Sequence, residues 1–296
     1  MEYKKTIIGL GALLTTTLLW GSSFPAIKIV VGVIDEYGYV GFRSLIAVLG
    51  LLPYTLYYHW RKGFDGKLVL GGLITGLTYA VGLWLQGWGM RYTTASNAAF
   101  ITGLSVVFVH VYTGLVLKRY SLMLFSSLIS ALTGLYFLTN PRVYGLNTGD
   151  LLVLAGAFAW AAYIVLVDRY SRYNPIVIVF YSMIPATLYI VPYTINTGSI
   201  ELSNLLLVAP FLVYLALACS DTATILQFYG QRFIRVEAAA IIYLLEPVFA
   251  SILAYIFLAE AMNPDQILGA ILILLAIFLA TINDIAGKSI RPHYSS

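Results

Sequence analysis

The chain has 296 residues, of which 60% are apolar and only 10% are charged, and its mean hydropathy is +0.87. Soluble domains carry about 25% charged residues, so this composition excludes a soluble globular protein. A membrane β-barrel is excluded as well, because barrel strands alternate polar and apolar residues, whereas the apolar runs here are long and unbroken. The sequence therefore predicts an all-α polytopic membrane protein.

Ten apolar stretches are long enough to cross a bilayer, which takes about 20 residues. The first follows Lys4 and Lys5, as in a signal peptide, but no small-residue cleavage site follows it, so we interpret it as a retained span. Connections rich in Asn, Pro and Gly separate the stretches. The predicted spans are 7–31, 38–58, 68–88, 96–117, 121–138, 149–167, 175–195, 205–228, 237–259 and 265–285.

Lys and Arg gather on one side of this predicted topology. With the N-terminus inside, 13 of them fall in inner segments, and only Arg91 and Arg142 fall in outer ones. Cytoplasmic loops are enriched in Lys and Arg, so we expect a multi-pass protein of the cell membrane with both termini in the cytoplasm. The net charge of +4 is explained by this topology, and we expect no nucleic-acid partner.

Residues 88–119 and 229–260 repeat one another at an offset of 141. Each half holds five spans, and because five is odd, the second half must enter the membrane from the opposite side. Inverted repeats of this kind are typical of secondary transporters. We expect residues 1–140 to form the first repeat, 149–285 the inverted second repeat, and 286–296 a cytoplasmic tail. Matching pairs include Gly89/Gly230, Arg91/Arg232, Ala98/Ala239, Ala99/Ala240, Ile101/Ile242, Leu104/Leu245, Val107/Val248 and Phe108/Phe249.

Several motifs of both halves suggest a family. They are LLWGSSFPAIK (18–28), FRS (42–44), YTTASNAAFI (92–101), GDLLVLAGAFAWAAYIV (149–165), FIRVEAAAIIYLLEPVFASILAYIFLAE (233–260) and GAILILLAIFLA (269–280). With them the chain resembles the EamA family of the drug/metabolite transporter superfamily over nearly its whole length. The resemblance implies a basket-like fold in which helices 1–4 and 6–9 surround a substrate cavity and helices 5 and 10 support it from the periphery.

The first half departs from this pattern in its fourth span. Ser105 and His110 occupy the positions that match Glu246 and Ser251. The first half therefore lacks the proline that follows Glu246 in the second, and we expect its fourth helix to be straighter than the ninth.

Three titratable residues are expected inside the membrane, where an ionisable side chain is costly and marks a functional site by default. Asp221 is expected to bind a substrate cation or relay a proton, with a hydrogen bond to a neighbouring Ser, Thr or Tyr as the alternative. For Glu246, proton or amine binding and a role as a protonated packing residue both stay open. His110 could titrate near neutral pH, but an interhelical hydrogen bond is the favoured interpretation.

Polar and aromatic residues inside the spans are candidates for a cavity wall. Gln86 and Gln227 are repeat partners, and Tyr79 lies on the same helix face as Gln86. The alternative for this polar stripe is hydrogen bonding between helices. Trp20 and Trp160 lie inside helices rather than at the membrane surface, so they predict an aromatic cavity wall, with plain packing as the alternative.

Lys28 and Arg43 are the two basic residues within spans, near the predicted outer ends. Long basic side chains near helix ends snorkel to the surface, and we expect this for both. The alternative is that they attract an anionic group at the outer mouth of a cavity.

Together these features predict a secondary transporter that exports small metabolites such as amino acids by alternating access. A carrier of nucleotide sugars or lipid head groups would need several basic cavity residues for phosphate. An intramembrane enzyme is disfavoured, because the sequence contains neither an HExxH nor a GxSxG motif. We expect a small-molecule substrate and the lipid bilayer as partners, no cofactor and no metal; a homodimer stays open.

Overall fold

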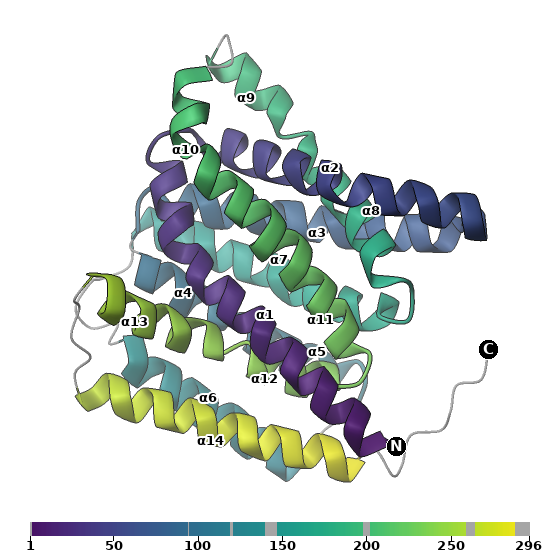
Figure 1. Ribbon diagram of the computed structural model, residues 1–296. Helices are drawn as coiled ribbons and strands as arrows, with labels where there is room; N and C mark the ends of the chain where they lie inside the picture. The colour runs from purple at the N-terminus through teal and green to yellow at the C-terminus, as the bar shows by residue number, and fades with distance from the viewer. Residues whose placement is uncertain are drawn as a thin grey trace.

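The computed structural model describes residues 2–93, 95–118, 121–139, 147–197, 202–258 and 264–287. Within these ranges the fold is helical, without strands, and the ten predicted spans are confirmed (Figure 1). Arg142 and residues 288–296 of the expected tail lie outside the described residues. The first half comprises α1 (Glu2–Val31), α2 (Glu36–Lys62), α3 (Gly66–Met90), α4 (Ala95–Gly103), α5 (Ser105–Leu115) and α6 (Leu122–Thr139).

The second half contains the same five spans, more often interrupted. Spans 7, 8 and 9 are each built from two or three consecutive helices, and span 8 includes the π-helix η2. The elements are α7 (Thr148–Tyr170), α8 (Pro175–Thr187), α9 (Ile190–Thr197), α10 (Leu202–Tyr214), η2 (Leu215–Thr222), α11 (Ala223–Gln231), α12 (Val236–Ile242), α13 (Leu245–Leu258) and α14 (Pro264–Gly287).

The first connection of each repeat starts its second span in the same way. Asp35 caps α2 by accepting a hydrogen bond from the backbone N–H of Gly38 at 2.7 Å. Asn174 caps α8 by accepting from the N–H groups of Ile176 and Val177, and Pro175 occupies the first helical position. Asp and Asn are favoured at this position because their side chains satisfy N–H groups that lack a helical partner. Local capping therefore repeats along with the helices.

The fourth span of the first half is interrupted although it lacks the proline found in the ninth span. α4 ends at Gly103 and α5 begins at Ser105, and the N–H of Leu104 bonds to the carbonyl of Ile101 at 3.1 Å in a tight turn. In the ninth span the break falls at Tyr243 and Leu244. The break needs no proline, because Gly103 lets Leu244 approach: a Cβ at Gly103 would lie 3.0 Å from the Leu244 side chain.

Helices α6 and α14 lie side by side at one edge of the bundle, as the resemblance implies for spans 5 and 10 (Figure 1). The hydroxyl of Ser130 donates to the carbonyl of Leu272 at 3.0 Å. A Cβ at Gly134 would lie 2.7 Å from the carbonyl oxygen of Gly269, so the two backbones touch. Small residues allow such close packing between membrane helices, and this pair supports the bundle from outside.

Two contacts join residues that are repeat partners of one another, and a third joins Ser130 to the neighbour of its repeat partner. Tyr79 contacts Ser220 and Gly103 contacts Leu244, both at an offset of 141, and Ser130 contacts Leu272 at an offset of 142. A residue touches its own two-fold mate only when both lie on the symmetry axis. The pseudo-two-fold axis of the inverted repeats therefore runs between α6 and α14, past the two helix breaks, to the contact between α3 and η2.

Candidate substrate cavity

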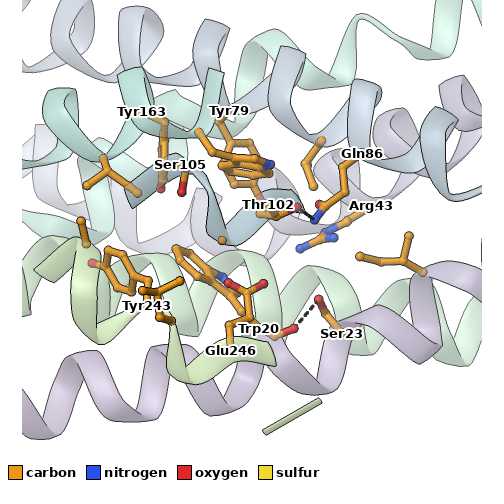
Figure 2. Close-up of a pocket in the computed structure, with 17 residues that line it drawn as sticks. Trp20, Ser23, Arg43, Tyr79, Gln86, Thr102, Ser105, Tyr163, Tyr243 and Glu246 are labelled. Carbon is orange, nitrogen blue, oxygen red and sulfur yellow. Dashed lines mark hydrogen bonds between the residues drawn. The ribbon is translucent and has the colours of Figure 1, made fainter. Parts of the chain in front are cut away.

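A cavity lies where this axis crosses the bundle, with walls from both repeats (Figure 2). Of the residues proposed from sequence, six line it, and Asp221, Gln227, His110 and Lys28 do not. The lining residues are Trp20, Ser23, Ile27, Arg43, Tyr79, Leu83, Gln86, Thr102, Gly103, Ser105, Trp160, Tyr163, Ile164, Ala240, Tyr243, Leu244 and Glu246.

Arg43 is directed into this cavity, so the expectation that it snorkels to the outer surface is wrong. Its side chain is 3% exposed. Its Nε donates to the hydroxyl of Ser220 at 2.7 Å, and one terminal nitrogen donates to the hydroxyl of Tyr39 at 2.5 Å. The guanidinium also lies 5.6 Å from the centre of the Tyr39 ring. Hydroxyl and ring partners inside the bundle replace the water that snorkelling would supply.

The π-helix η2 supplies the hydroxyl that positions Arg43. Ser220 lies in η2 and also hydrogen-bonds the hydroxyl of Tyr79 at 2.8 Å. The indole N–H of Trp20 donates to the carbonyl of Cys219 at 3.0 Å, using a backbone oxygen of the widened helix. π-helical turns are rare and are frequent at functional sites. Here the turn joins Arg43, Tyr79 and Trp20, three lining residues from three different helices.

Glu246 faces the same cavity from the first turn of α13. The N-terminus of a helix carries a partial positive charge that favours a carboxylate. Gly21 of α1 packs closely behind it, because a Cβ there would lie 2.7 Å from the carbonyl oxygen of Glu246. Pro247 falls in this same first turn, where a missing backbone donor costs nothing. In Figure 2 the Glu246 carboxylate lies beside Trp20.

Aromatic rings form much of the remaining wall. The Tyr79 ring lies 5.5 Å from that of Trp160 and 5.4 Å from that of Tyr163, and the Trp20 ring lies 5.4 Å from that of Tyr243. These separations are within the range preferred by aromatic pairs. Both tryptophans proposed from sequence therefore line the cavity, one from each repeat.

The polar stripe expected from both repeats lines the cavity on one side only. Gln86 lines the cavity, and its amide donates to the hydroxyl of Thr102 at 3.3 Å. Gln227, its repeat partner, is fully buried outside the lining. The two halves thus place equivalent glutamines in different surroundings.

Asp221 lies beside the cavity rather than in it. The residue is 5% exposed and belongs to η2, and a Cβ at Gly50 of α2 would lie 3.2 Å from its Oδ2. Its Oδ1 has no hydrogen-bond partner among the described residues. The carboxylate is therefore held against α2.

Lys28 neither snorkels freely nor enters the cavity. Its ammonium donates to the backbone carbonyls of Met90 and Thr93, where α3 ends, and so ties α1 to α3. The adjacent turn is held by Arg91, which forms an ion pair with Glu36 at 2.7 Å. These contacts close the end of the bundle that the sequence predicts to face outward.

Several lining residues were not proposed from sequence. Tyr163 follows Trp160 by three residues, and Tyr243 precedes Glu246 by three, so helical spacing places each near a residue that was proposed. Thr102 and Ser105 flank the break in the fourth span, where no proline marks an interruption. Within the described ranges no three His, Cys, Asp or Glu side chains come together as metal ligands.

Two inverted five-helix repeats around a polar and aromatic cavity define a membrane transporter. Residues 7–140 and 147–282 match the EamA-like transporter family, and the chain belongs to this family.

The chain is 32% identical over 282 residues to an uncharacterized transporter of Archaeoglobus fulgidus, covering 94% of this chain and 87% of the relative. It is 26% identical over 191 residues to the aromatic amino acid exporter YddG of Salmonella typhimurium, covering 57% and 60%. A solved crystal structure shares the fold with a TM-score of 0.72 at 17% identity, over 96% of this chain and 98% of the other.

Proposed function

We propose that this transporter exports small zwitterionic metabolites, amino acids above all, by alternating access. The observation that carries the proposal is the charge pattern of the cavity. Arg43 and Glu246 both line it, and neither forms an ion pair with another described residue. A cargo that carries one carboxylate and one ammonium would satisfy both.

Each charged group suits one end of such a cargo. The planar guanidinium of Arg43 can bind a carboxylate through two parallel hydrogen bonds. Glu246 can accept from an ammonium group, with Trp20 beside it to add a cation–π contact. The rings of Tyr79, Trp160 and Tyr163 would then cover an apolar or aromatic side chain. The Salmonella relative is named an aromatic amino acid exporter, which agrees with an aromatic amino acid as cargo.

The repeat axis gives the cargo site its place in alternating access. In inverted-repeat transporters the substrate binds near the midplane at broken helices, and the two repeats rock about it. Here the breaks at Leu104 and Tyr243–Leu244 both lie at the cavity. The excess of Lys and Arg on one side places both termini in the cytoplasm under this proposal.

A phosphate-bearing cargo suits the cavity less well. A nucleotide sugar carries a negative charge on each phosphate of its diphosphate bridge. Arg43 is the one Lys or Arg among the described residues that line the cavity. A nucleotide sugar would therefore leave negative charge uncompensated beside Glu246.

The test is uptake of radiolabelled amino acids into proteoliposomes. We expect saturable uptake of aromatic amino acids, reduced by roughly 10- to 150-fold in kcat/KM by Arg43→Gln, since a hydrogen bond to a charged group contributes about 1.5–3 kcal/mol. Arg43→Lys keeps the charge without the planar fork and should recover only part of the rate. Arg169→Gln removes an exposed arginine and serves as the control.

Two outcomes would overturn the proposal. If the native protein transports none of the twenty common amino acids, the cargo is of another class. If Arg43→Gln and Arg169→Gln transport equally well, the guanidinium does not contact the cargo.

A further inference from the structure

A second pair of buried ionisable residues lies outside the cavity, where α5 meets α12. His110 is in α5 and Glu237 is in the first turn of α12. Both residues are 0% exposed, and neither lines the cavity. The cargo site described above makes no use of them.

Each of the two side chains has one atom without a partner. His110 Nδ1 lies 2.8 Å from the carbonyl oxygen of Val106, which fixes the ring and leaves Nε2 unbonded among the described residues. One oxygen of Glu237 pairs with Nε of Arg235 at 3.5 Å, whereas Oε1 has no hydrogen-bond partner among the described residues. Buried polar atoms in native proteins are nearly always satisfied. Helices α5 and α12 pack against each other, and each carries one such atom.

Among the ionisable residues on the helices packed against α5, Glu237 is the one best placed to interact with His110. From α12 the ionisable neighbours are Glu237 and, at the cap, Arg235. From α7 they are Tyr163 and, at the inner end, Asp168 and Arg169, while α4 contributes no ionisable residue. Of these, Glu237 is the one fully buried carboxylate, and it lies on a helix that packs against α5.

The inverted repeat supplies a comparison within the same chain. At an offset of 141, Glu237 corresponds to Ser96 and His110 to Ser251. The contact of α4 with α13 is therefore the two-fold mate of the contact of α5 with α12, and the sequence has serine at both of the matching positions. Only the half-helices nearer the predicted cytoplasmic side carry the titratable pair.

We propose that His110 and Glu237 form a proton-binding site that controls the separation of α5 from α12. The inference rests on the transport function proposed above. One proton binds Nε2 of the neutral imidazole, and the resulting imidazolium donates to Oε1 of Glu237. The bound proton thus holds the two half-helices together, and its loss to water leaves two unsatisfied atoms that favour their separation.

The site is linked to the cavity through these same helices. Ser105 begins α5 and lines the cavity, and Ala240 lies in α12 one turn after Glu237 and lines it too. A change in the distance between α5 and α12 therefore moves two cavity walls. Because both side chains are buried, proton exchange requires that movement.

The first experiment observes the imidazole directly and needs no cargo. The chain has three histidines, so His59→Gln with His293→Gln leaves His110 as the only one. We expect its NMR signal in detergent-solubilised protein to change between about pH 5 and 8, the range in which imidazole titrates, and we expect Glu237→Gln to alter that response. A signal that does not change with pH in either protein would overturn the proposal.

The second experiment measures transport. In proteoliposomes we expect the exchange rate of an aromatic amino acid to depend on pH in the native protein and to lose that dependence in His110→Asn and Glu237→Gln, with the KM for the amino acid unchanged. A titrating His110 in a protein that moves no amino acid would overturn the cargo assignment and keep the proton site. Unaltered pH dependence in both variants would overturn the proton site and keep the cargo.

Discussion

The breaks in the fourth and ninth spans are two copies of one device with different chemistry. Both lie on the pseudo-two-fold axis, where Gly103 and Leu244 touch, and both open onto the cavity. In the fourth span the second half-helix starts with Ser105, whereas the ninth span has Glu246 at the matching position. Both repeats therefore contain the broken span, but only the second repeat has a charged residue, Glu246, at this position. A cavity on a symmetry axis can in this way bind an asymmetric cargo.

The largest effect should separate these two positions. Glu246→Ala removes a charged acceptor, and we expect a loss of roughly 10- to 150-fold in kcat/KM for amino-acid uptake, whereas Ser105→Ala removes a neutral hydroxyl and should cost about 2- to 12-fold at most. Proteoliposome uptake at several concentrations measures both variants. Equal losses would mean that Glu246 contributes no more to cargo binding than Ser105 does, and would contradict a cargo with a charged group at one end for Glu246.

The second comparison concerns close packing in the two halves. A Cβ at Gly76 of α3 would overlap the carbonyl oxygen of Ser182 in α8, whereas the repeat partner of Gly76 is Leu217, which packs against Gly50 of α2. Both helix pairs pack closely, but the glycine at the contact lies on α3 in one pair and on α2 in the other. We expect Gly76→Ala to lower the stability by about 1–3 kcal/mol through overpacking.

Thermal unfolding in detergent measures this change, with Gly11→Ala as its control. Nothing lies within 4 Å of a Cβ at Gly11, so that variant should be neutral or more stable, because alanine favours helix over glycine by about 1 kcal/mol. A Gly76→Ala protein as stable as native would show that α3 and α8 can move apart freely.

Much of this fold could be predicted from the sequence, because it follows from local and repeated signals. Apolar stretches gave the ten spans, and the offset of 141 gave the inversion. The break at Leu104 was missed because proline was taken as its cause, whereas a glycine and a side chain from the other repeat allow it. Position along a helix was insufficient for Arg43 as well, since its partners Ser220 and Tyr39 determine where the side chain points.

Asp221 was also misjudged from its position in the sequence, because it was expected at the cavity and lies outside it. Its depth in the membrane suggested a functional carboxylate, but the wide turn of η2 directs Ser220 to Arg43 and Tyr79 and leaves Asp221 against α2. Which of two adjacent residues faces a cavity depends on the local helix geometry. Sequence spacing assumes a regular α-helix and cannot reveal a π-helical turn.

The third prediction follows from this placement. Asp221→Asn should reduce amino-acid uptake less than Glu246→Ala does, by about 12-fold at most, because Asp221 lies outside the cavity and a neutral hydrogen bond contributes only about 0.5–1.5 kcal/mol. The same uptake assay compares the two. A loss in Asp221→Asn as large as that of Glu246→Ala would place Asp221 in the cargo or proton path despite its position.

The smallest expected effect lies at the caps that begin the second span of each repeat. Asp35 caps α2 and Asn174 caps α8. Burial raises the pKa of Asp35 from its ordinary value of 3.8, although the N–H of Gly38 opposes the change. The folded state therefore binds this proton more tightly than the unfolded state, and stability is lost as the pH rises above 3.8 and the side chain ionises.

Asp35→Asn gives the first repeat the cap that the second already has. Asparagine caps a helix as well as aspartate does, and it carries no charge to desolvate. We expect a small rise in Tm at neutral pH, less than the change for Gly76→Ala, that disappears below about pH 3.8. Unfolding followed in detergent across this pH range measures it, with the exposed Asp265→Asn as control. A fall in Tm at neutral pH would instead show that the charge of Asp35 stabilises this end of the bundle, by attraction to Arg91 or to the start of α2, and that the two caps differ for a reason.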